Sequence, residues 1–276
     1  MRELQPGRRK NASSSVPFLR WAGSKRQLIP VLSEYWKPSY TRYVEPFAGS
    51  AALFFHLDPA RALLGDINPE LMSAYRQIKT NLPLVLNALS SLKKSKGQYL
   101  QLRAANPELL SPPVRAARFI YLNRFCFNGL YRTNRQGQFN VPYSGSRTGR
   151  IPSAEQFELC AAKLRKTTLL AAGFELTLRR VRQGDFVYMD PPFAVKARRI
   201  FSEYDATCFD QLSINRLREW LINLNSRDIP FLVSYADSDE ARFLARGFKT
   251  RTVFVRRNIA GFSNNRKKDT ELLIFN

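Results

Sequence analysis

The spacing of apolar and polar residues divides the chain into three stretches. Before about residue 80, short apolar runs that end in an acid or a turn alternate with segments of helical periodicity. Between about residues 82 and 125 the apolar residues recur at i, i+3 and i+4, as in "PPVRAARFIYLNRF", which predicts helices. Strand and helix alternate again after about Ser153. The pattern therefore predicts one α/β core with a parallel sheet, interrupted by an inserted segment.

The first stretch contains two strand-turn-helix units. "RYVEPFAGSAALFF" predicts a short strand, a tight turn at residues 46–50 and the start of a helix. The next strand ends at Asp66, and the helix after it has Asn68 as its N-cap and Pro69 in its first turn.

The last stretch supplies the remaining predicted strands, which are "FVYMD", "PFLVSYAD", "TRTVFVRR" and "ELLIFN". A helix over "FDQLSINRLREWLINLNS" lies between the first two. We expect its apolar stripe to pack in the core; the stripe consists of Leu212, Leu217, Trp220, Leu221 and Leu224.

The net charge of the chain indicates what kind of partner it binds. The 276 residues include 44 Lys and Arg against 22 Asp and Glu, a net charge of +22 with a pI near 10.4. A charge of this size indicates a polyanionic partner. A lipid surface would require a basic amphipathic helix or a polybasic cluster beside a lipid anchor, and neither is present, so nucleic acid is favoured. The basic, turn-rich segment "CFNGLYRTNRQGQFNVPYSGSRTGRIP" carries four arginines, which are Arg132, Arg135, Arg147 and Arg150.

Several classes of protein are disfavoured. Three widely spaced cysteines, Cys126, Cys160 and Cys208, indicate neither a disulfide framework nor a zinc site, and favour the reducing cytosol. His56 is the only histidine, so Ser-His-Asp catalysis and histidine-rich metal sites are nearly excluded; we expect it to be packed at a helix end. No apolar run approaches the roughly 20 residues of a membrane helix. The polar residues 1–15 read as a disordered basic tail and not as a secretory signal.

The most specific chemical signal is "DFVYMDPPFAV". A buried strand runs into Asp190 and two prolines, which cannot continue the ladder. The amino group of a heteroaromatic base is a poor nucleophile because its lone pair is delocalised. The Asp190 side chain and the Pro191 carbonyl can accept its two hydrogens and free that lone pair, while Phe193 stacks on the ring. The alternative is an ordinary strand end and rigid turn, with Phe193 in the core.

Two other predicted strands also end in acids, Glu45 and Asp66. Ligands of open α/β sheets bind beyond the carboxyl ends of the strands, where Asp66 can accept hydrogen bonds from a ribose diol. The turn at Gly49 lets a ligand approach the backbone closely. An ordinary strand-helix turn explains this segment about as well.

Together these motifs resemble one family. "FLRWAGSKRQLIP", "EPFAGSAALFF", "GDINPELMSAYRQIK", "NRFCFNGLYRTNRQGQFNVPYS", "GDFVYMDPPF" and "VRRNIAGFSNNRKKDTELLIFN" are similar, in order, to the motifs of α-class, D12-type DNA adenine-N6 methyltransferases of the deoxyadenosine methylase (Dam) family. The similarity covers nearly everything after Val16 and is greatest to GATC-modifying members of bacterial restriction-modification systems. It implies a Rossmann-like, S-adenosylmethionine-dependent methyltransferase sheet (residues 16–80 and 153–276) with an inserted helical and hairpin domain for DNA recognition (residues 81–152).

The resemblance also implies roles for single residues. The S-adenosylmethionine site is implied to be lined by Trp21, Lys25, Asp66 and Asp190, with a floor of Pro46, Phe47 and Gly49. The catalytic tetrapeptide is Asp190, Pro191, Pro192 and Phe193. The family's reaction moves a methyl group to N6 of an adenine flipped out of duplex DNA, without a metal.

For the DNA, the resemblance implies that Phe127 and Asn128 insert into the duplex beside the extruded adenine. Arg132 corresponds to the arginine that reads guanine, consistent with two hydrogen bonds to O6 and N7. Contacts around the thymine are implied for Asn140 and Pro142, and a contact to the outer guanine for Arg20, where relatives usually carry lysine. We expect a cytoplasmic monomer that acts on double-stranded DNA, with any cognate restriction endonuclease acting separately.

The chain departs from the family pattern at three places. Phe193 stands where most members have tyrosine, and the turn reads Gly49-Ser50-Ala51 where further glycines are common. The loop after Phe193 is unusually basic, with Lys196, Arg198 and Arg199. Two other functions stay open at this stage: a methyltransferase for RNA or a protein glutamine, and a DNA-binding module without turnover.

Overall fold

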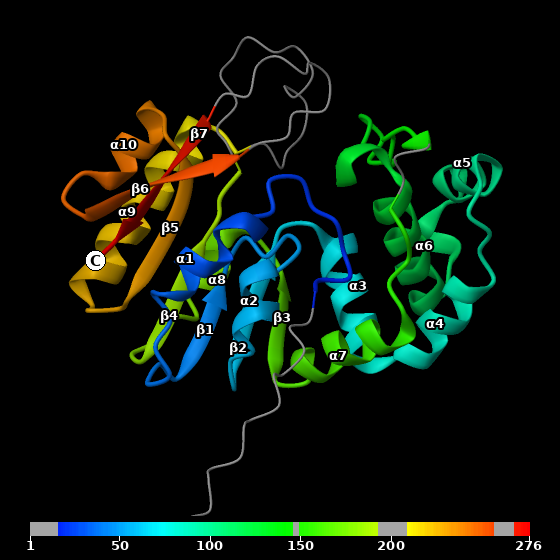
Figure 1. The fold of residues 1–276 in the computed structure, drawn as a ribbon, viewed down its shortest axis with the longest axis horizontal. Coiled ribbons are helices and arrows are strands. Elements are labelled where there is room, and N and C mark those ends of the chain that lie inside the picture. Colours follow the sequence, from blue (N-terminus) through cyan, green and yellow to red (C-terminus); the bar gives the residue numbers. More distant parts are fainter. Residues whose placement is uncertain (1–15, 146–148, 193–208, 257–267) are drawn as a thin grey trace, which may run out of the picture.

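The computed structural model describes residues 16–145, 149–192, 209–256 and 268–276 (Figure 1). The predicted tail at residues 1–15, Phe193 and the basic loop after it lie outside the described residues.

The core of the molecule is a seven-stranded sheet with strand order β3-β2-β1-β4-β5-β7-β6 (Figure 1). Strands β1 to β5 are parallel, and β7 pairs antiparallel with both β5 and β6. The strands are β1 (Arg42–Glu45), β2 (Ala62–Asp66), β3 (Thr167–Ala171), β4 (Asp185–Met189), β5 (Phe231–Ala236), β6 (Lys249–Arg256) and β7 (Lys268–Phe275). This is a Rossmann-like α/β fold. The strand order changes direction between β1 and β4, the position where such sheets bind ligands.

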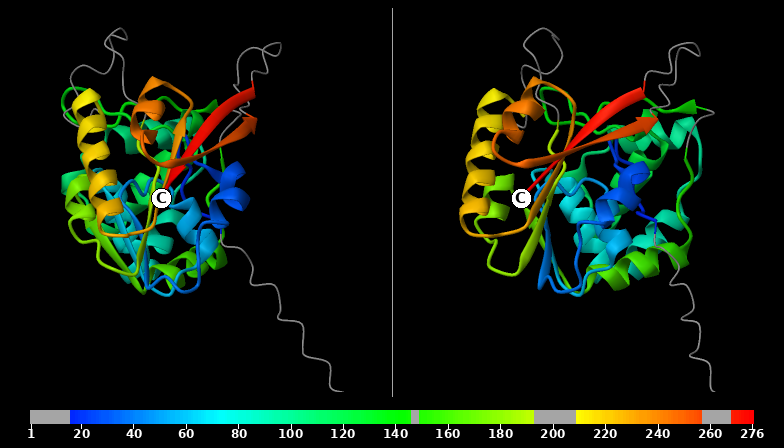
Figure 2. Two further views of the ribbon diagram at one scale, coloured as in Figure 1. Left: turned by 90° about the vertical axis from the view of Figure 1, so that its left-hand side faces the viewer. Right: turned by 60° about the vertical axis from the view of Figure 1, so that its left-hand side comes forward.

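Helices cover both faces of the sheet, so most strand residues are buried (Figure 2). Neighbouring residues of β1 show the alternation: Tyr43 packs on one face and Val44 on the other. The face of Tyr43 is covered by α1 (Ile29–Ser33), α2 (Ala52–Leu57), α3 (Pro69–Thr80) and α7 (Ala154–Leu164). The face of Val44 is covered by α8 (Phe174–Leu178), α9 (Gln211–Ser226) and α10 (Asp239–Ala245).

The inserted segment forms a helical layer at one side of the sheet (Figure 1). It consists of α4 (Leu82–Ser90), α5 (Lys96–Ala104) and α6 (Pro112–Phe125). The α6 helix packs on α3, and Arg115 of α6 pairs with Glu70 of α3. After α6 the chain forms an antiparallel hairpin, with bridges between Cys126 and Tyr143 and between Thr133 and Phe139.

Most predicted elements are confirmed. The side chain of Asn68 caps α3 by accepting a hydrogen bond from Leu71 N at 3.1 Å, and Pro69 is the first helical residue. The sequence did not predict β3, "TTLLA", because it is an edge strand with a single buried residue and therefore lacks a continuous apolar run. The expectation of a parallel sheet holds for β1 to β5, whereas β7 runs antiparallel to both of its neighbours, β5 and β6.

Two packing expectations are wrong. Leu212 is 66% exposed, because it lies about 200° around α9 from Ile214, which begins the buried stripe. That stripe consists of Ile214, Leu217, Leu221 and Leu224, with Trp220 partly buried beside it. His56 lies near the end of α2 as expected, but its side chain is exposed. In the described ranges, none of the helices has the length and apolar character needed to cross a bilayer.

Candidate active site

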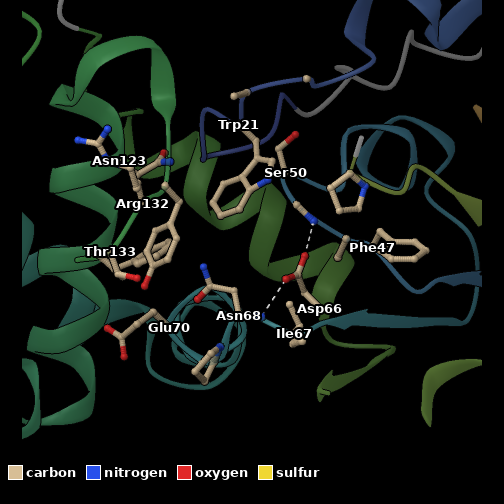
Figure 3. Close-up of a pocket in the computed structure, with 18 of the residues that line it drawn as sticks. Trp21, Phe47, Ser50, Asp66, Ile67, Asn68, Glu70, Asn123, Arg132 and Thr133 are labelled. Carbon is tan, nitrogen blue, oxygen red and sulfur yellow. Dashed lines mark hydrogen bonds between the residues drawn. The ribbon is translucent and has the colours of Figure 1, made fainter. Parts of the chain in front are cut away.

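The carboxyl ends of β1, β2 and β4 open into one cleft of about 1610 Å³ (Figure 3). The core side of this cleft carries three strand-ending acids, Glu45, Asp66 and Asp190, and the hairpin of the insert forms the opposite wall. The volume exceeds the roughly 300–1,000 Å³ of a site for one small ligand. It is therefore large enough for a nucleoside-sized cofactor and a second group such as a base.

The turn after β1 lies so close to the Trp21 ring that a side chain at position 49 would clash with it. Gly49 has a φ of +46°, and a Cβ there would lie 2.8 Å from Cδ1 of Trp21. The Gly49 N–H donates to Asp66 Oδ2 at 2.9 Å, and Asn68 N–H donates to Oδ1 at 2.9 Å (Figure 3). Each carboxylate oxygen keeps a further lone pair for a ligand hydroxyl. Burial raises the pKa of Asp66, while the two backbone donors lower it.

Aromatic and apolar side chains line the cleft on both sides of Asp66. Trp21 stacks on Tyr131 of the hairpin, with ring centroids 6.1 Å apart and planes inclined by 16°. Phe47 stacks on Phe174 of α8 at 5.2 Å. Ile67 is 51% exposed and also lines the cleft, an unusual place for an isoleucine. These surfaces suit the flat faces of a purine.

Asp190 belongs to a buried polar network. Lys25 Nζ lies 3.0 Å from Asp190 Oδ1 and 3.3 Å from Glu271 Oε1 of β7. Ser234 Oγ donates to Asp190 Oδ1 at 3.3 Å, and its hydroxyl also pairs with Tyr188 OH at 2.9 Å. Both contacts to Asp190 are made by Oδ1, so the network fixes the carboxylate by one oxygen.

The electrostatics of this network keep Asp190 close to titration. Burial raises the pKa of Asp190 to about 6, against the opposing effect of Lys25. Burial also raises the pKa of Glu45 well above its usual range, and Tyr43 OH donates to its Oε2 at 2.9 Å. Burial alone would lower the pKa of Lys25, but the charges of Asp190 and Glu271 together raise it. Asp190 is therefore ionised at neutral pH and can accept hydrogen bonds.

The hairpin presents its polar residues toward the cleft and its rim. Arg132 Nε donates to Asn140 Oδ1 at 2.7 Å across the hairpin, and both side chains line the cleft (Figure 3 shows Arg132). Phe127 is 43% exposed at the start of the hairpin, beside Asn128 with a φ of +53°. The Asn123 side chain holds both backbone groups of Arg20, at 2.8 and 2.6 Å, which ties the amino-terminal segment to α6.

Comparison with known proteins decides the family. The family model of the D12 class of N6 adenine-specific DNA methyltransferases matches residues 21–259. A type II methyltransferase of Lactococcus lactis subsp. cremoris is 34% identical over 97% of both chains. The DNA adenine methylase of Escherichia coli strain K12 is 33% identical over 93% of both chains. A type II methyltransferase of Methanocaldococcus jannaschii is 30% identical over 94% of this chain and 98% of that protein.

The chain belongs to the D12 class of N6 adenine-specific DNA methyltransferases. It is therefore an enzyme that methylates adenine in DNA, and its positive charge suits that substrate.

Within this DNA methyltransferase, most predicted site residues meet in one cleft. The residues that line it are Trp21, Lys25, Pro46, Phe47, Gly49, Asp66, Arg132, Asn140, Asp190, Pro191 and Pro192. Four predicted DNA-binding residues lie outside the cleft lining, and these are Arg20, Phe127, Asn128 and Pro142. These four residues lie close to one another at the base of the hairpin. Phe127 N–H donates to Pro142 O at 3.0 Å, and Gly129, next to Asn128, lies so close to Arg20 that a Cβ on it would be 2.8 Å from Cβ of Arg20.

The sequence pattern does not predict several residues of the methyltransferase site, and two of them, Glu271 and Ser234, contact Lys25 and Asp190 without lining the cleft. Glu271 is nevertheless a buried acid within the apolar run "TELLIFN", an anomaly that a search for charges in apolar runs finds. Tyr188 and Ser234 alternate with apolar residues in β4 and β5 and gave no such signal. Ile67 and Tyr131 are each adjacent to a predicted site residue, Asp66 and Arg132, but were not themselves predicted.

Proposed function

We propose that this adenine methyltransferase uses S-adenosylmethionine to methylate N6 of the adenine in GATC, after extruding that base from duplex DNA. The observation that carries the proposal is the position of Asp190, Pro191 and Pro192. They follow β4 directly and line the same cleft as Asp66 and Trp21. An acceptor for an amino group and a candidate nucleoside site are thus side by side.

The cleft fits the proposed cofactor. Asp66 offers an acceptor on each oxygen for a ribose diol, and Gly49, which has no side chain, lets the Trp21 ring lie directly against the turn. Ile67 and Phe47 offer apolar surface for the cofactor's adenine. The cofactor would supply a methyl group bonded to a positively charged sulfur.

Asp190 and Pro191 would prepare the substrate amine. Asp190 is ionised above pH 6 and so can accept one N6–H, while the Pro191 carbonyl accepts the other. Neither proline has a backbone N–H, so neither can donate a hydrogen bond that would compete with the amino group for these acceptors. The N6 lone pair would take the methyl group as the C–S bond breaks, and the proton that N6 then loses would pass to the Asp190 carboxylate that accepts its hydrogen bond. The protein contribution is positioning and electrostatic preorganisation.

The hairpin would deliver the base and read its neighbours. Phe127 and Asn128, exposed at its start, would fill the space that the extruded adenine leaves in the duplex. Arg132 would read guanine with two hydrogen bonds, while Asn140 and Pro142 contact the thymine and Arg20 the outer guanine. The motif resemblance and the similarity to a protein named DNA adenine methylase support GATC as the target.

We further propose that residues 16–80 and 153–276 form the catalytic core and residues 81–152 the target-recognition unit. The enzyme would act in the cytoplasm as a monomer, without a metal, and any cognate restriction endonuclease would work separately.

The test is transfer of labelled methyl groups to short duplexes that differ at one base pair. We expect transfer to a GATC duplex and loss of at least 100-fold when the adenine is replaced or the outer guanine is changed, with no transfer to single-stranded RNA of the same sequence. Equal transfer to all duplexes would reject GATC, and label in RNA alone would reject DNA as the preferred substrate.

A further inference from the structure

The edge of the sheet opposite the cleft is strongly basic. We call it the amino edge, because the parallel strands begin there (lower side of the sheet in Figure 1). Exposed cations precede three of the strands: Arg61 directly before β2, Arg165 and Lys166 directly before β3, and Arg179, Arg180 and Arg182 in the segment that leads into β4.

Strand register places some of these cations in a row. Tyr43 pairs with Ala62, and Ala62 pairs with Thr167. The residues one position earlier, Arg42, Arg61 and Lys166, are therefore level on three neighbouring strands. Arg182 lies beyond the start of β4, the neighbour of β1 on the other side. Four neighbouring strands span about 14 Å at their usual spacing.

Few acids neutralise the amino edge. Asp185 pairs with Arg42 through two hydrogen bonds at 3.1 and 2.6 Å, and Asp58 lies 3.7 Å from Lys163. Within the described ranges, none of the six exposed cations forms an ion pair with either of these acids or with any other. The exposed Asp228, before β5, is a further acid at this edge.

A hollow lies among these side chains. It has a volume of about 470 Å³ and is lined by Arg42, Leu63, Thr168, Arg179, Arg180, Val181 and Arg182. Its walls thus carry four guanidinium groups and one hydroxyl, which are donors suited to phosphate oxygens.

We infer that the amino edge is a second DNA-binding surface, which holds the phosphate backbone of a duplex segment other than the one in the cleft. The strands of five residues separate the two edges by about 17 Å, and the edges face opposite ways. A straight duplex in the cleft cannot also lie across the amino edge. The enzyme would therefore bind two segments at once and pass between them without full release. The inference rests on DNA as the substrate, and not on GATC or on the role of Arg132.

Helix ends offer a competing explanation. Arg165 and Arg179 are the C-caps of α7 and α8, where a positive charge stabilises the helix dipole. If the cations only stabilised helix ends, replacing them would lower the thermal stability and leave DNA binding unchanged. The test therefore uses cations that are not helix caps.

The test variant is Arg61→Gln, Lys166→Gln and Arg182→Gln, one cation from each strand start; no side-chain hydrogen bond of these three is present in the described structure. The matched control is Arg76→Gln, Arg242→Gln and Arg251→Gln, three exposed cations outside the target-recognition unit that line neither the cleft nor the hollow. Both variants lower the net charge by three, so an effect of overall charge is the same in each.

The measurement is binding of a second, labelled duplex to enzyme already saturated with a short unlabelled target duplex. We expect the test variant to weaken this second binding at least tenfold and to lower its salt slope by about 2.7, which corresponds to three phosphate contacts. Methylation of the short duplex and the melting temperature should match those of the control.

Three results would overturn the inference: equal loss in both variants, no second duplex bound by the wild type, or second-site binding of phosphatidylglycerol vesicles or RNA in preference to DNA. Failure to bind the first duplex would instead contradict the proposed function of the cleft.

Discussion

At the scale of single residues, the proposed chemistry depends on one carboxylate held by a cation. Asp190 is 22% exposed at its side chain and takes its contact from Lys25, which Glu271 holds from β7. The charged groups around Asp190 come from four elements: Lys25 before α1, Glu45 of β1, Tyr188 of its own strand and Glu271 of β7. Lys25 and the hydrogen bond from Ser234 favour the ionised form, but burial outweighs them and the pKa of Asp190 is raised.

This arrangement predicts the pH dependence of methyl transfer. The pKa of Asp190 is raised to about 6, so its acceptor function is present above that pH and is lost as pH falls below it. Glu271→Gln removes a negative charge, lowers the pKa of Asp190 and moves the acid limb of the kcat profile to lower pH. Lys25→Met removes the cation and moves that limb to higher pH.

The two shifts are checked in single-turnover profiles from pH 5 to pH 8 with saturating cofactor and DNA. Opposite shifts support an electrostatic link to Asp190. Shifts in the same direction, or equal losses at every pH, would contradict it, since damage to the fold does not depend on the sign of the charge removed.

At the scale of elements, the hairpin carries a prediction about target reading. Arg132 is held by Asn140 at 2.7 Å, so Asn140 positions the guanidinium as well as facing the cleft itself. Arg132→Ala should cost about 1–3 kcal/mol at one base pair and relax selectivity there. Asn140→Ala should relax selectivity at the same base pair, through the lost contact to Arg132, as well as at the thymine that Asn140 is proposed to contact.

A double-mutant cycle over duplexes with single base changes measures this coupling. At the base pair that Arg132 reads, we expect the double variant to lose little more than Arg132→Ala alone. Additive losses at that base pair would mean that Asn140 does not act there through Arg132.

Two leucine substitutions in α9 test which of its side chains form the buried apolar stripe. Leu221→Ala leaves a cavity between α9 and the sheet and should lower the free energy of unfolding by about 2–5 kcal/mol. Leu212→Ala removes an exposed side chain and should change it by less than about 0.5 kcal/mol. Urea unfolding of the two variants checks the difference. A cost for Leu212→Ala close to that for Leu221→Ala would contradict the observed orientation of α9.

These elements show how far the sequence predicts the fold. Strands with buried faces, such as "FVYMD", and the Asn68-Pro69 cap follow from local pattern. The edge strand β3 does not, because half-exposed residues lack a strong period. The prediction that Leu212 is buried was wrong because apolar residues close in sequence can lie on different faces of a helix. Only the position of the buried stripe shows which of them face the core.

At the scale of the whole molecule, the site depends on strand order. Asp66, Asp190 and Glu271 are far apart in sequence, and only the order β2-β1-β4-β5-β7 brings their strand ends to one edge. The motifs predicted Asp66 and Asp190 because each follows a recognisable strand. Glu271 was not predicted, because its partner Lys25 comes from the other end of the chain and the pairing depends on the antiparallel β7.

The same topology separates the two charged regions of the molecule. The carboxyl ends of the strands carry the acids of the cleft, and the amino ends carry exposed cations. The acids of the cleft would thus face the positive sulfur of the proposed cofactor, while the exposed cations of the amino edge would attract DNA at the proposed second surface.

The most direct test of the central claim is single-turnover methyl transfer by Asp190→Ala, with DNA and cofactor binding measured on the same samples. Ser234→Ala is the matched control, since it removes the hydrogen bond to Asp190 but keeps the carboxylate. We predict that Asp190→Ala loses at least 1,000-fold in transfer rate yet keeps most of its DNA affinity, an effect of about 4 kcal/mol on the barrier, while Ser234→Ala loses less than tenfold. Methyl transfer by Asp190→Ala at the wild-type rate would contradict the account.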